Sequence, residues 1–178
     1  MNILADKIAK FENNIDPKEW INLIELASTS CPLESVSRRP HLTMELPNLA
    51  SESDSIESIN LRTKLLNVIY SPIKEYMNQY NISNMELKKD FITVSKLLGG
   101  GMKRHRDDRQ VDSDNFICMF YINDDYDGGE ISFPDHDIVY KPKSGDILIY
   151  QSKFMHEVLP MSGNPRYNIG IGFRGPIC

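Results

Sequence analysis

The chain has 178 residues, a net charge of −5 at pH 7 and a pI near 5.4, with 40% apolar and 25% charged residues. This length favours one domain over residues 1–178, with enough chain to bury a sizeable core. The acidic balance argues against a general nucleic-acid binder, which usually carries a basic field.

The cysteines and the apolar runs bear on the compartment. Cys31, Cys118 and Cys178 are widely spaced and suggest neither a disulfide framework nor a zinc site. The first residues lack the apolar stretch of a signal peptide, and no run approaches the roughly 18 apolar residues of a membrane span. These features predict a cytoplasmic protein with no membrane partner, and they leave the oligomeric state open.

Residues 1–89 are predicted to be mainly helical support. Residues 7–13 form a candidate short strand, and a helix should begin at Asp16, whose side chain can cap it. Pro17 suits the first helical position, and Glu19 completes a capping box. The apolar face of this helix comprises Trp20, Ile21, Leu23, Ile24 and Ala27.

Residues 30–53 have an irregular pattern with three prolines and many serines. A loop of this length is either a disordered connection or a lid over a site. A second helical region is predicted from near Asp54, and Ser71-Pro72 should kink or divide it. Its expected core stripe is Ile56, Ile59, Leu65, Leu66, Ile69, Ile73, Met77 and Tyr80.

From residue 90 the pattern changes to short runs rich in β-branched and aromatic residues, separated by turn residues such as Gly99-Gly100-Gly101. This pattern predicts a β-sandwich or jelly roll over residues 90–178, against which the preceding helices would pack on one sheet. The runs are 91–98, 115–123, 128–133, 137–142, 145–150 and 166–173.

His105 and Asp107 form a His-x-Asp pair. In an extended segment alternate side chains point the same way, so an imidazole and a carboxylate would face one spot. Such a pair is two thirds of the facial triad of non-haem Fe(II) oxygenases. Alone, the pair is weak evidence for a metal site, because a lone match is more often a polar turn.

Three further residues favour the metal site. His156 lies 49 residues after Asp107, and Arg166 follows it by ten residues. A distant third ligand is expected where separate strands meet at a barrel mouth, and a buried Arg can hold a carboxylate with two hydrogen bonds. The Tyr121 phenol could add a hydrogen bond to the same carboxylate.

With these residues in order, the C-terminal half resembles the prolyl 4-hydroxylase-like branch of the 2-oxoglutarate/Fe(II) oxygenase superfamily, from about residue 90 to 174. The resemblance is carried by His105-Arg106-Asp107, Tyr121-Ile122-Asn123, Gly128-Gly129-Glu130, Pro142-Lys143-Ser144-Gly145, His156-Glu157-Val158 and Arg166. More weakly, the helix at Asp16 resembles the N-terminal helix of that family.

This resemblance implies an α+β protein with a double-stranded β-helix (jelly-roll, cupin-like) core. It implies Fe(II) at His105, Asp107 and His156, and the distal carboxylate of 2-oxoglutarate between Arg166 and Tyr121. With 2-oxoglutarate as the co-substrate, the reaction would also use O2, and ascorbate would be an optional reductant. His105, Asp107, His156 and Arg166 would then be the catalytic set.

The chain departs from the family at several positions. Lys96 stands where relatives often carry a Tyr near the co-substrate, so it either pairs with that carboxylate or points to solvent. Met102 replaces a Tyr near the substrate, which puts the usual substrate in doubt. Gly170 and Gly172, near the place of a bulky Trp, indicate either a roomier pocket or close backbone packing.

Other polar residues receive plainer interpretations. His136 is expected to be exposed in a turn and His41 lacks ligand spacing, while Asp108 should point away from Asp107. Residues 106–114 are a second candidate loop over a substrate. The cluster of Lys103, Arg104, Arg106 and Arg109 either meets an acidic substrate or forms a solvated rim.

The leading functional hypothesis is hydroxylation of a prolyl or other side chain of a peptide or protein. Oxidation of a free amino acid, another small molecule or a nucleobase is the enzymatic alternative. The ten-residue interval between His156 and Arg166 favours the hydroxylase branch over the nucleobase demethylases. A catalytically silent binding module on the same fold is the non-enzymatic alternative, which the complete set of four residues disfavours.

Overall fold

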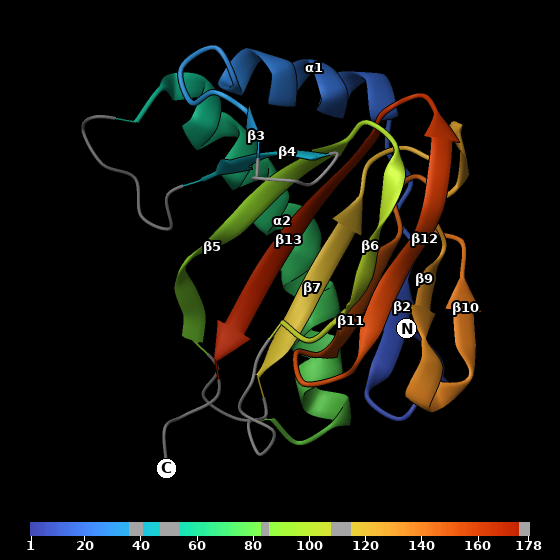
Figure 1. The fold of residues 1–178 in the computed structure, drawn as a ribbon. Coiled ribbons are helices and arrows are strands. Elements are labelled where there is room, and N and C mark those ends of the chain that lie inside the picture. Colours follow the sequence, from blue (N-terminus) through green and yellow to red (C-terminus); the bar gives the residue numbers. More distant parts are fainter. Residues whose placement is uncertain (36–40, 47–53, 83–85, 108–114, 175–178) are drawn as a thin grey trace.

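The computed structural model describes residues 1–35, 41–46, 54–82, 86–107 and 115–174. Two helices and two antiparallel sheets make up the architecture (Figure 1). Neither helix in this described part of the chain combines the length and apolarity needed to cross a membrane. The chain order is β1(Asn2–Ala5), β2(Ile8–Phe11), α1(Pro17–Ala27), β3(Glu34–Ser35), β4(His41–Glu45), α2(Ile56–Gln79), β5(Glu86–Leu97), β6(Gly100–His105), β7(Phe116–Tyr121), β8(Tyr126–Gly128), β9(Ile131–Phe133), the 3₁₀ turn η1(Pro134–His136), β10(Ile138–Tyr140), β11(Ile147–Gln151), β12(His156–Gly163) and β13(Arg166–Arg174).

The helix α1 begins as the sequence predicts. Asp16 caps it by accepting a hydrogen bond from the Lys18 amide, and Pro17 occupies the first turn. The Glu19 carboxylate, expected to complete a capping box, instead lies 2.5 Å from Lys64 Nζ and forms an ion pair with α2. Trp20, at the buried face of α1, packs edge-on against Phe120 of β7 and anchors the helix to the sheet.

The helix α2 starts after Ser55, whose hydroxyl accepts a hydrogen bond from the Ser58 amide. It continues through Pro72 for 24 residues, so the expected division at Ser71-Pro72 is wrong. Pro72 is buried inside this helix, although its ring nitrogen cannot donate the usual backbone hydrogen bond. Ile56 is 67% exposed and is not part of the core stripe, which instead uses Leu61 and Tyr76 with Leu65 and Ile69.

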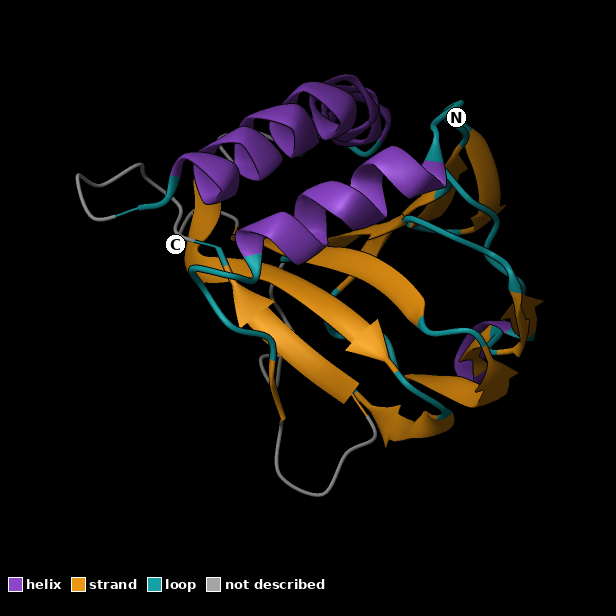
Figure 2. Cartoon of the chain, turned by 90° about the horizontal axis from the view of Figure 1, so that it is seen from above, coloured by secondary structure: helices purple, strands orange, loops and turns teal. Residues whose placement is uncertain are grey.

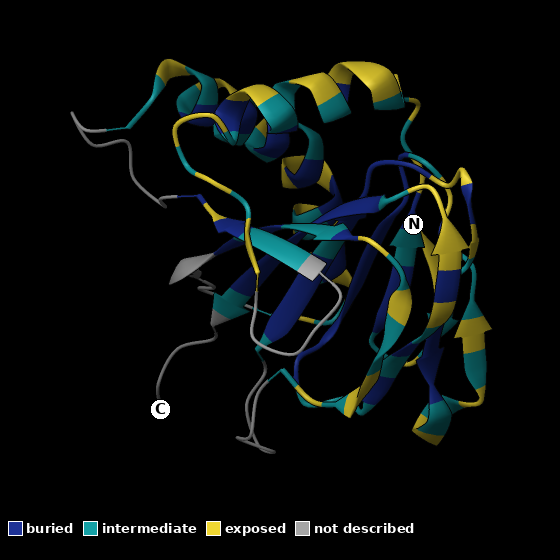
Figure 3. Ribbon diagram, turned by 45° about the horizontal axis from the view of Figure 1, so that its top comes forward, coloured by how far each residue is buried: buried dark blue, intermediate teal, exposed yellow. Residues whose placement is uncertain are grey.

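The larger sheet has eight strands in the order β1-β2-β11-β7-β13-β5-β4-β3, and the smaller one has the order β10-β9-β12-β6, with β8 pairing β12. Both helices cover the outer face of the larger sheet (Figure 2). This arrangement confirms the expected double-stranded β-helix with helices on one sheet. Buried residues gather in the central strands of the larger sheet, and the outward helix faces are exposed (Figure 3).

Alternation along the central strands separates two cores. Phe116, Cys118 and Phe120 of β7 join the core under the helices, while Ile117 and Tyr121 face the smaller sheet. The same alternation along β5, β11 and β13 gives each strand one face under the helices and one face toward the interior between the sheets. The interior face is therefore where a site can form.

Two predictions for the N-terminal half need correction. Residues 30–53 are not wholly irregular, because β4 pairs in antiparallel register with β5, from His41 opposite Leu97 to Glu45 opposite Thr93. Residues 36–40 and 47–53, on which the choice between lid and disordered connection falls, lie outside the described residues. The strand β1 was not predicted, whereas the strand expected at residues 7–13 is confirmed as β2.

Candidate metal and co-substrate site

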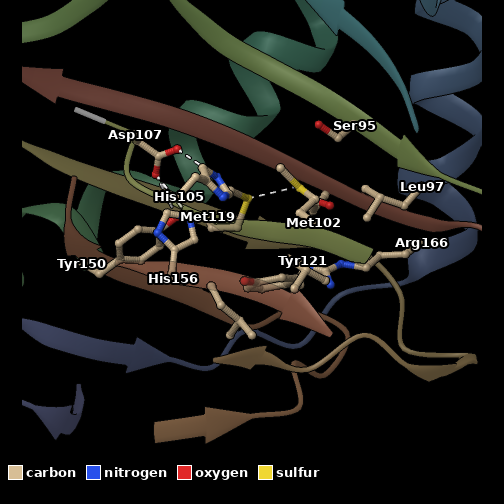
Figure 4. A pocket seen from close by; sticks show the side chains of 13 residues that line it. Ser95, Leu97, Met102, His105, Asp107, Met119, Tyr121, Tyr150, His156 and Arg166 are labelled. Atoms are coloured by element: carbon tan, nitrogen blue, oxygen red, sulfur yellow. Dashed lines mark hydrogen bonds and ion pairs between the residues drawn. The ribbon is translucent and has the colours of Figure 1, made fainter. Parts of the chain in front are cut away.

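Three donor side chains converge between the sheets. His105 ends β6, Asp107 follows it by two residues, and His156 begins β12 directly opposite His105 in the strand register. The His105 Nε2 atom lies 3.7 Å from Asp107 Oδ1, and His156 Nε2 lies 3.5 Å from Asp107 Oδ2. One donor atom from each residue lies within 4.8 Å of the other two. The sequence thus correctly predicted which residues meet (Figure 4).

Backbone carbonyls fix which imidazole nitrogen is available. The Nδ1 atom of His105 lies 2.7 Å from the Lys103 carbonyl oxygen, and Nδ1 of His156 lies 3.0 Å from that of Phe154. A carbonyl oxygen can only accept, so both Nδ1 atoms carry a proton, and in the neutral imidazole the lone pair lies on Nε2, the atom nearer to Asp107. Histidines that bind a metal are commonly oriented in this way, by a hydrogen bond from the ring nitrogen that does not bind the metal.

His156 is almost fully buried, and burial lowers its pKa below the ordinary value, although the Asp107 charge acts in the opposite direction. The neutral imidazole is the form that binds a metal. His105 is more accessible, with 29% of its side chain exposed, so it lies at the open side of the group.

Asp107 is held by the larger sheet. Its amide donates to the Ser152 carbonyl, and its Oδ2 accepts a hydrogen bond of 3.3 Å from the Tyr150 hydroxyl. Burial, reinforced by the Asp107 charge, raises the pKa of the Tyr150 phenol well above its ordinary value. Tyr150 therefore stays protonated and donates, which leaves Oδ1 and the second lone pair of Oδ2 for another partner.

Replacing Tyr150 with phenylalanine should weaken Mn(II) binding about fivefold, because Asp107 loses the hydrogen bond that orients its carboxylate. Tyr140→Phe is the matched control, since Tyr140 donates to the Asp146 carboxylate away from the three donors. A titration of metal-free protein with Mn(II) measures the effect. Equal affinities for wild-type protein and Tyr150→Phe would show that Tyr150 does not orient Asp107.

Arg166 begins β13 and is 2% exposed. One of its terminal nitrogens donates to the Gly129 carbonyl at 2.7 Å, and its Nε is buried without a hydrogen-bond partner. No carboxylate of the described residues forms an ion pair with it. An unpaired buried cation is strongly unfavourable, so this guanidinium is suited to an anion from outside the chain.

Tyr121 lies beside that cation. Its ring centroid is 5.0 Å from the Arg166 guanidinium carbon, and its hydroxyl is buried without a partner. Burial raises the pKa of the Tyr121 phenol above its ordinary value, outweighing the opposite effect of the Arg166 charge. A protonated hydroxyl and an unpaired Nε are two donors to one carboxylate, as the sequence interpretation expects.

A single cavity of about 100 Å³ joins the two ends of the site. Figure 4 shows Asp107 and the histidines at one end of it and Tyr121 and Arg166 at the other. Met102 and Met119 lie between them in that view. The cavity is lined by Ser95, Leu97, Met102, His105, Asp107, Met119, Tyr121, Ile131, Tyr150, His156, Val158, Arg166 and Asn168.

Neither expectation for Lys96 holds. Its Nζ lies 2.8 Å from the Glu25 carboxylate of α1 and above the Tyr167 ring, while its strand neighbours Ser95 and Leu97 line the cavity. Alternation along β5 thus turns Lys96 to the helix side of the sheet. Hydrogen bonds from Lys96 and then Tyr167 lower the pKa of Glu25, so this pair is charged.

Lys96→Met should leave the affinity for 2-oxoglutarate within about twofold of wild type and lower the free energy of unfolding by less than about 1 kcal/mol, because the ion pair is partly solvated. Calorimetric titration and thermal unfolding measure the two quantities. A tenfold loss of affinity would restore Lys96 as a co-substrate contact.

The remaining sequence candidates separate clearly. Met102 does line the cavity, and a Cβ on Gly170 would lie 3.2 Å from Met119 Cε, so this glycine leaves room for the Met119 side chain. His136 was expected to be exposed, but it is half-buried: it lies in η1, and its ring packs against Phe154. It is not part of the donor group.

The basic cluster and the second loop are only partly described. Lys103, Arg104 and Arg106 are exposed, and Arg104 pairs with Glu157 at 3.5 Å. Arg109, Asp108 and most of the candidate loop 106–114 lie outside the described residues. Sequence reasoning missed Tyr150 and Asn168, for which only their places in the runs 145–150 and 166–173 gave a signal.

The donor chemistry fits a first-row divalent metal, because two neutral imidazoles and one carboxylate are the nitrogen and oxygen ligands of the facial triad. The orphaned Arg166 Nε and Tyr121 hydroxyl fit a carboxylate in the same cavity. A double-stranded β-helix with these two features defines the class of non-haem iron oxygenases that use a 2-oxo acid. In agreement, residues 92–173, a little under half of the chain, match the family model described as the 2OG-Fe(II) oxygenase superfamily, whose name implies Fe(II) and 2-oxoglutarate.

One curated relative is a PKHD-type hydroxylase from Colwellia psychrerythraea, 29% identical over 85 residues. The match covers 43% of this chain and 38% of the relative, so the chain spans well under half the length of that protein.

Three solved structures share the fold at low sequence identity. A 2OG-Fe(II) oxygenase family oxidoreductase from Burkholderia pseudomallei has a TM-score of 0.70 at 14% identity, covering 95% of this chain and 84% of that one. The viral collagen prolyl hydroxylase of Paramecium Bursaria Chlorella virus-1, solved with 2OG, has a TM-score of 0.66 at 18% identity, and the match covers 96% of this chain and 97% of that one. A prolyl hydroxylase from Trichoplax adhaerens, solved with a hypoxia inducible factor peptide fragment, has a TM-score of 0.65 at 16% identity, and the match covers 95% of this chain and 84% of that one.

Proposed function

We propose that this chain is an Fe(II)- and 2-oxoglutarate-dependent dioxygenase that hydroxylates a C–H bond in a prolyl or other side chain of a peptide or protein. The observation that carries the proposal is Arg166, a buried cation with no anionic partner among the described residues, in the same cavity as a group of two histidines and a carboxylate. A purely structural arginine would have an acidic partner in the fold.

In this proposal His105, Asp107 and His156 hold the iron, and Arg166 and Tyr121 hold the distal carboxylate of 2-oxoglutarate. When bound, the iron and 2-oxoglutarate would activate O2, so that one oxygen atom enters succinate as carbon dioxide is released and the other enters the hydroxylated C–H bond. The protein contributes orientation. The carbonyl-bound Nδ1 atoms aim both imidazoles, and Tyr150 holds Asp107.

The shape of the cavity supports the binding roles. Arg166 and Tyr121 hold the distal end of the acid away from the donors, so its other end is directed toward His105 and His156. Apolar side chains between the two ends, including Met119 and Val158, exclude water from this space. His105 lies at the more exposed side, where a peptide side chain can approach.

The peptide substrate class is supported by the similarity of fold to prolyl hydroxylases, one of them solved with a peptide fragment. It is also consistent with the exposure of His105, because a side chain of a larger substrate could reach the site from that side. A free amino acid remains the rival substrate class.

The test is incubation with Fe(II), 2-oxoglutarate, ascorbate and a library of proline-containing and other peptides. We expect succinate formation together with a peptide gaining the mass of one oxygen atom, both requiring 2-oxoglutarate. The Asp107→Ala protein is the background control. Succinate no higher than this background, with peptides and with free amino acids, would refute an enzymatic function and favour a silent binding module.

A further inference from the structure

Asn123 follows directly after β7 and is buried, with 4% of its surface exposed. Its Oδ1 accepts a hydrogen bond of 2.7 Å from the Tyr167 amide, and its Nδ2 donates to the Pro165 carbonyl at 2.9 Å. The two partners fix the orientation of the side-chain amide, because an N–H can only donate and a carbonyl oxygen can only accept. The two bonds therefore hold the backbone on both sides of Arg166.

A simpler role for Asn123 is local, because its Nδ2 also donates to Asp125 Oδ1 at 2.6 Å in the same turn. That contact stabilises the turn after β7. The bonds to Pro165 and Tyr167, however, join segments 42 and 44 residues apart, which a turn does not require. They connect the end of β7 to the beginning of β13.

The consequence for the site is geometric. Arg has a long side chain, and its guanidinium is placed only as well as its Cα–Cβ bond is directed. Asn123 restrains the peptide planes before and after Arg166, and it lies two residues beyond Tyr121 on the same chain segment. Together with the pairing of β13 with β5 and β7, this one side chain thus helps to fix the relative position of the two residues proposed to hold the distal carboxylate.

Other hydrogen bonds also restrain Tyr167 at the beginning of β13. The Ile122 amide donates to the Tyr167 carbonyl, and the Tyr167 hydroxyl donates to Glu25 Oε1 at 2.5 Å. These bonds fix Tyr167, whereas among the described side chains Asn123 is the one that also bonds Pro165, the residue before Arg166. Asn123 is therefore the link through which both flanks of Arg166 are held.

We propose that Asn123 is a positioning residue for 2-oxoglutarate: by bonding Pro165 and Tyr167 it directs Arg166 toward the distal carboxylate. The proposal rests on the proposed function, since it concerns the same carboxylate. Asparagine suits the role because one planar group offers both an acceptor and two donors. Aspartate has the same shape but lacks the donors, and it would face the Asp125 carboxylate.

The test compares ligand binding by calorimetry on Mn(II)-loaded protein, without turnover. Asn123→Ala is expected to raise the Kd for 2-oxoglutarate about tenfold, and Asn123→Asp roughly fivefold. The Kd for Mn(II) should stay within about twofold of wild type. The affinity for 2-oxobutyrate, which has no distal carboxylate, should also be unchanged, because the effect acts only through Arg166.

Two controls separate positioning from loss of stability. Asn164→Ala removes a hydrogen bond to Asp125 at the same turn without touching the flanks of Arg166, so it should bind 2-oxoglutarate as wild type does. Leu61→Ala creates a cavity in the core under the helices and lowers the melting temperature without a change in this Kd. If Asn123→Ala does not fold, the isosteric Asn123→Asp provides the measurement.

The outcomes are distinct. A wild-type Kd for 2-oxoglutarate in the Asn123 variants would overturn this inference and leave the proposed function intact. Equal losses for 2-oxoglutarate, 2-oxobutyrate and Mn(II), or an equal loss in Leu61→Ala, would also overturn it in favour of a structural role. Wild-type protein that binds no 2-oxoglutarate would overturn the inference together with the proposed function.

Discussion

Arg166→Met is expected to raise the Kd for 2-oxoglutarate about a hundredfold or more, because the buried positive charge and its hydrogen bonding to the distal carboxylate disappear together. Arg166→Lys should show a smaller loss of about tenfold, because lysine keeps the charge but presents a single point of contact. Calorimetric titration of Mn(II)-loaded protein measures both. The affinity for 2-oxobutyrate should change little, since it lacks the carboxylate that Arg166 would bind.

The same substitution has an expected effect on stability. Arg166 is buried, and no anion of the described part of the chain pairs with it, so the ligand-free methionine variant should be no less stable than the wild-type protein. Excess 2-oxoglutarate should raise the melting temperature of the wild-type protein and not that of the variant, because a ligand stabilises only the form that binds it.

Arg104→Met is the matched control for Arg166→Met. Arg104 is 55% exposed and pairs with Glu157 on the outer side of the smaller sheet. Its loss should leave the Kd for 2-oxoglutarate unchanged. The contrary result is an Arg166 variant that binds 2-oxoglutarate normally while its free energy of unfolding falls by more than about 2 kcal/mol. That result would show that Arg166 stabilises the fold, through its contacts with the Gly129 carbonyl and the neighbouring tyrosine rings.

Asp107→Ala is expected to lower succinate formation about a thousandfold and to weaken Mn(II) binding about a hundredfold, because it removes one of three protein ligands and the only anionic one. The loss of affinity should be larger than that of Tyr150→Phe, which changes only the orientation of the carboxylate. Metal titration of chelator-treated protein and a succinate assay under saturating 2-oxoglutarate check the two values.

Asp135→Ala provides the control for charge. Asp135 is exposed in η1. Replacing it with alanine removes one negative charge, as Asp107→Ala does, but leaves the three donor residues unchanged. This variant should bind Mn(II) and form succinate like the wild-type protein. If Asp107→Ala retained wild-type metal affinity, the two histidines would have to bind the metal by other means, and the proposed ligand set would be wrong.

Local features of this fold were readable from the sequence because they depend on near neighbours. The cap at Asp16, the strand at residues 7–13 and the alternation along the runs after residue 90 each follow from backbone geometry within a few residues. The identity and order of His105, Asp107 and His156 were also readable, because their chemistry is specific and the strand pattern around them is regular.

Features that depend on packing between distant segments were not readable in this way. The sequence suggested a break at Pro72, but burial of that face of α2 keeps the helix continuous. It suggested an irregular segment before residue 54, but the edge of β5 provides a pairing partner for β4. Backbone hydrogen bonds to another strand cannot be inferred from a segment that lacks its own strong pattern.

The site shows the same division. The sequence by itself determined the candidate ligands, the arginine and the tyrosine, because each is a chemically distinctive residue at a defined interval. Only the tertiary structure decided that Lys96 faces α1, that Tyr150 reaches Asp107, and that Asn123 bonds both neighbours of Arg166. These facts depend on which face of a strand is turned inward and on contacts between segments far apart in the chain, and that is set by the assembly of the sheets.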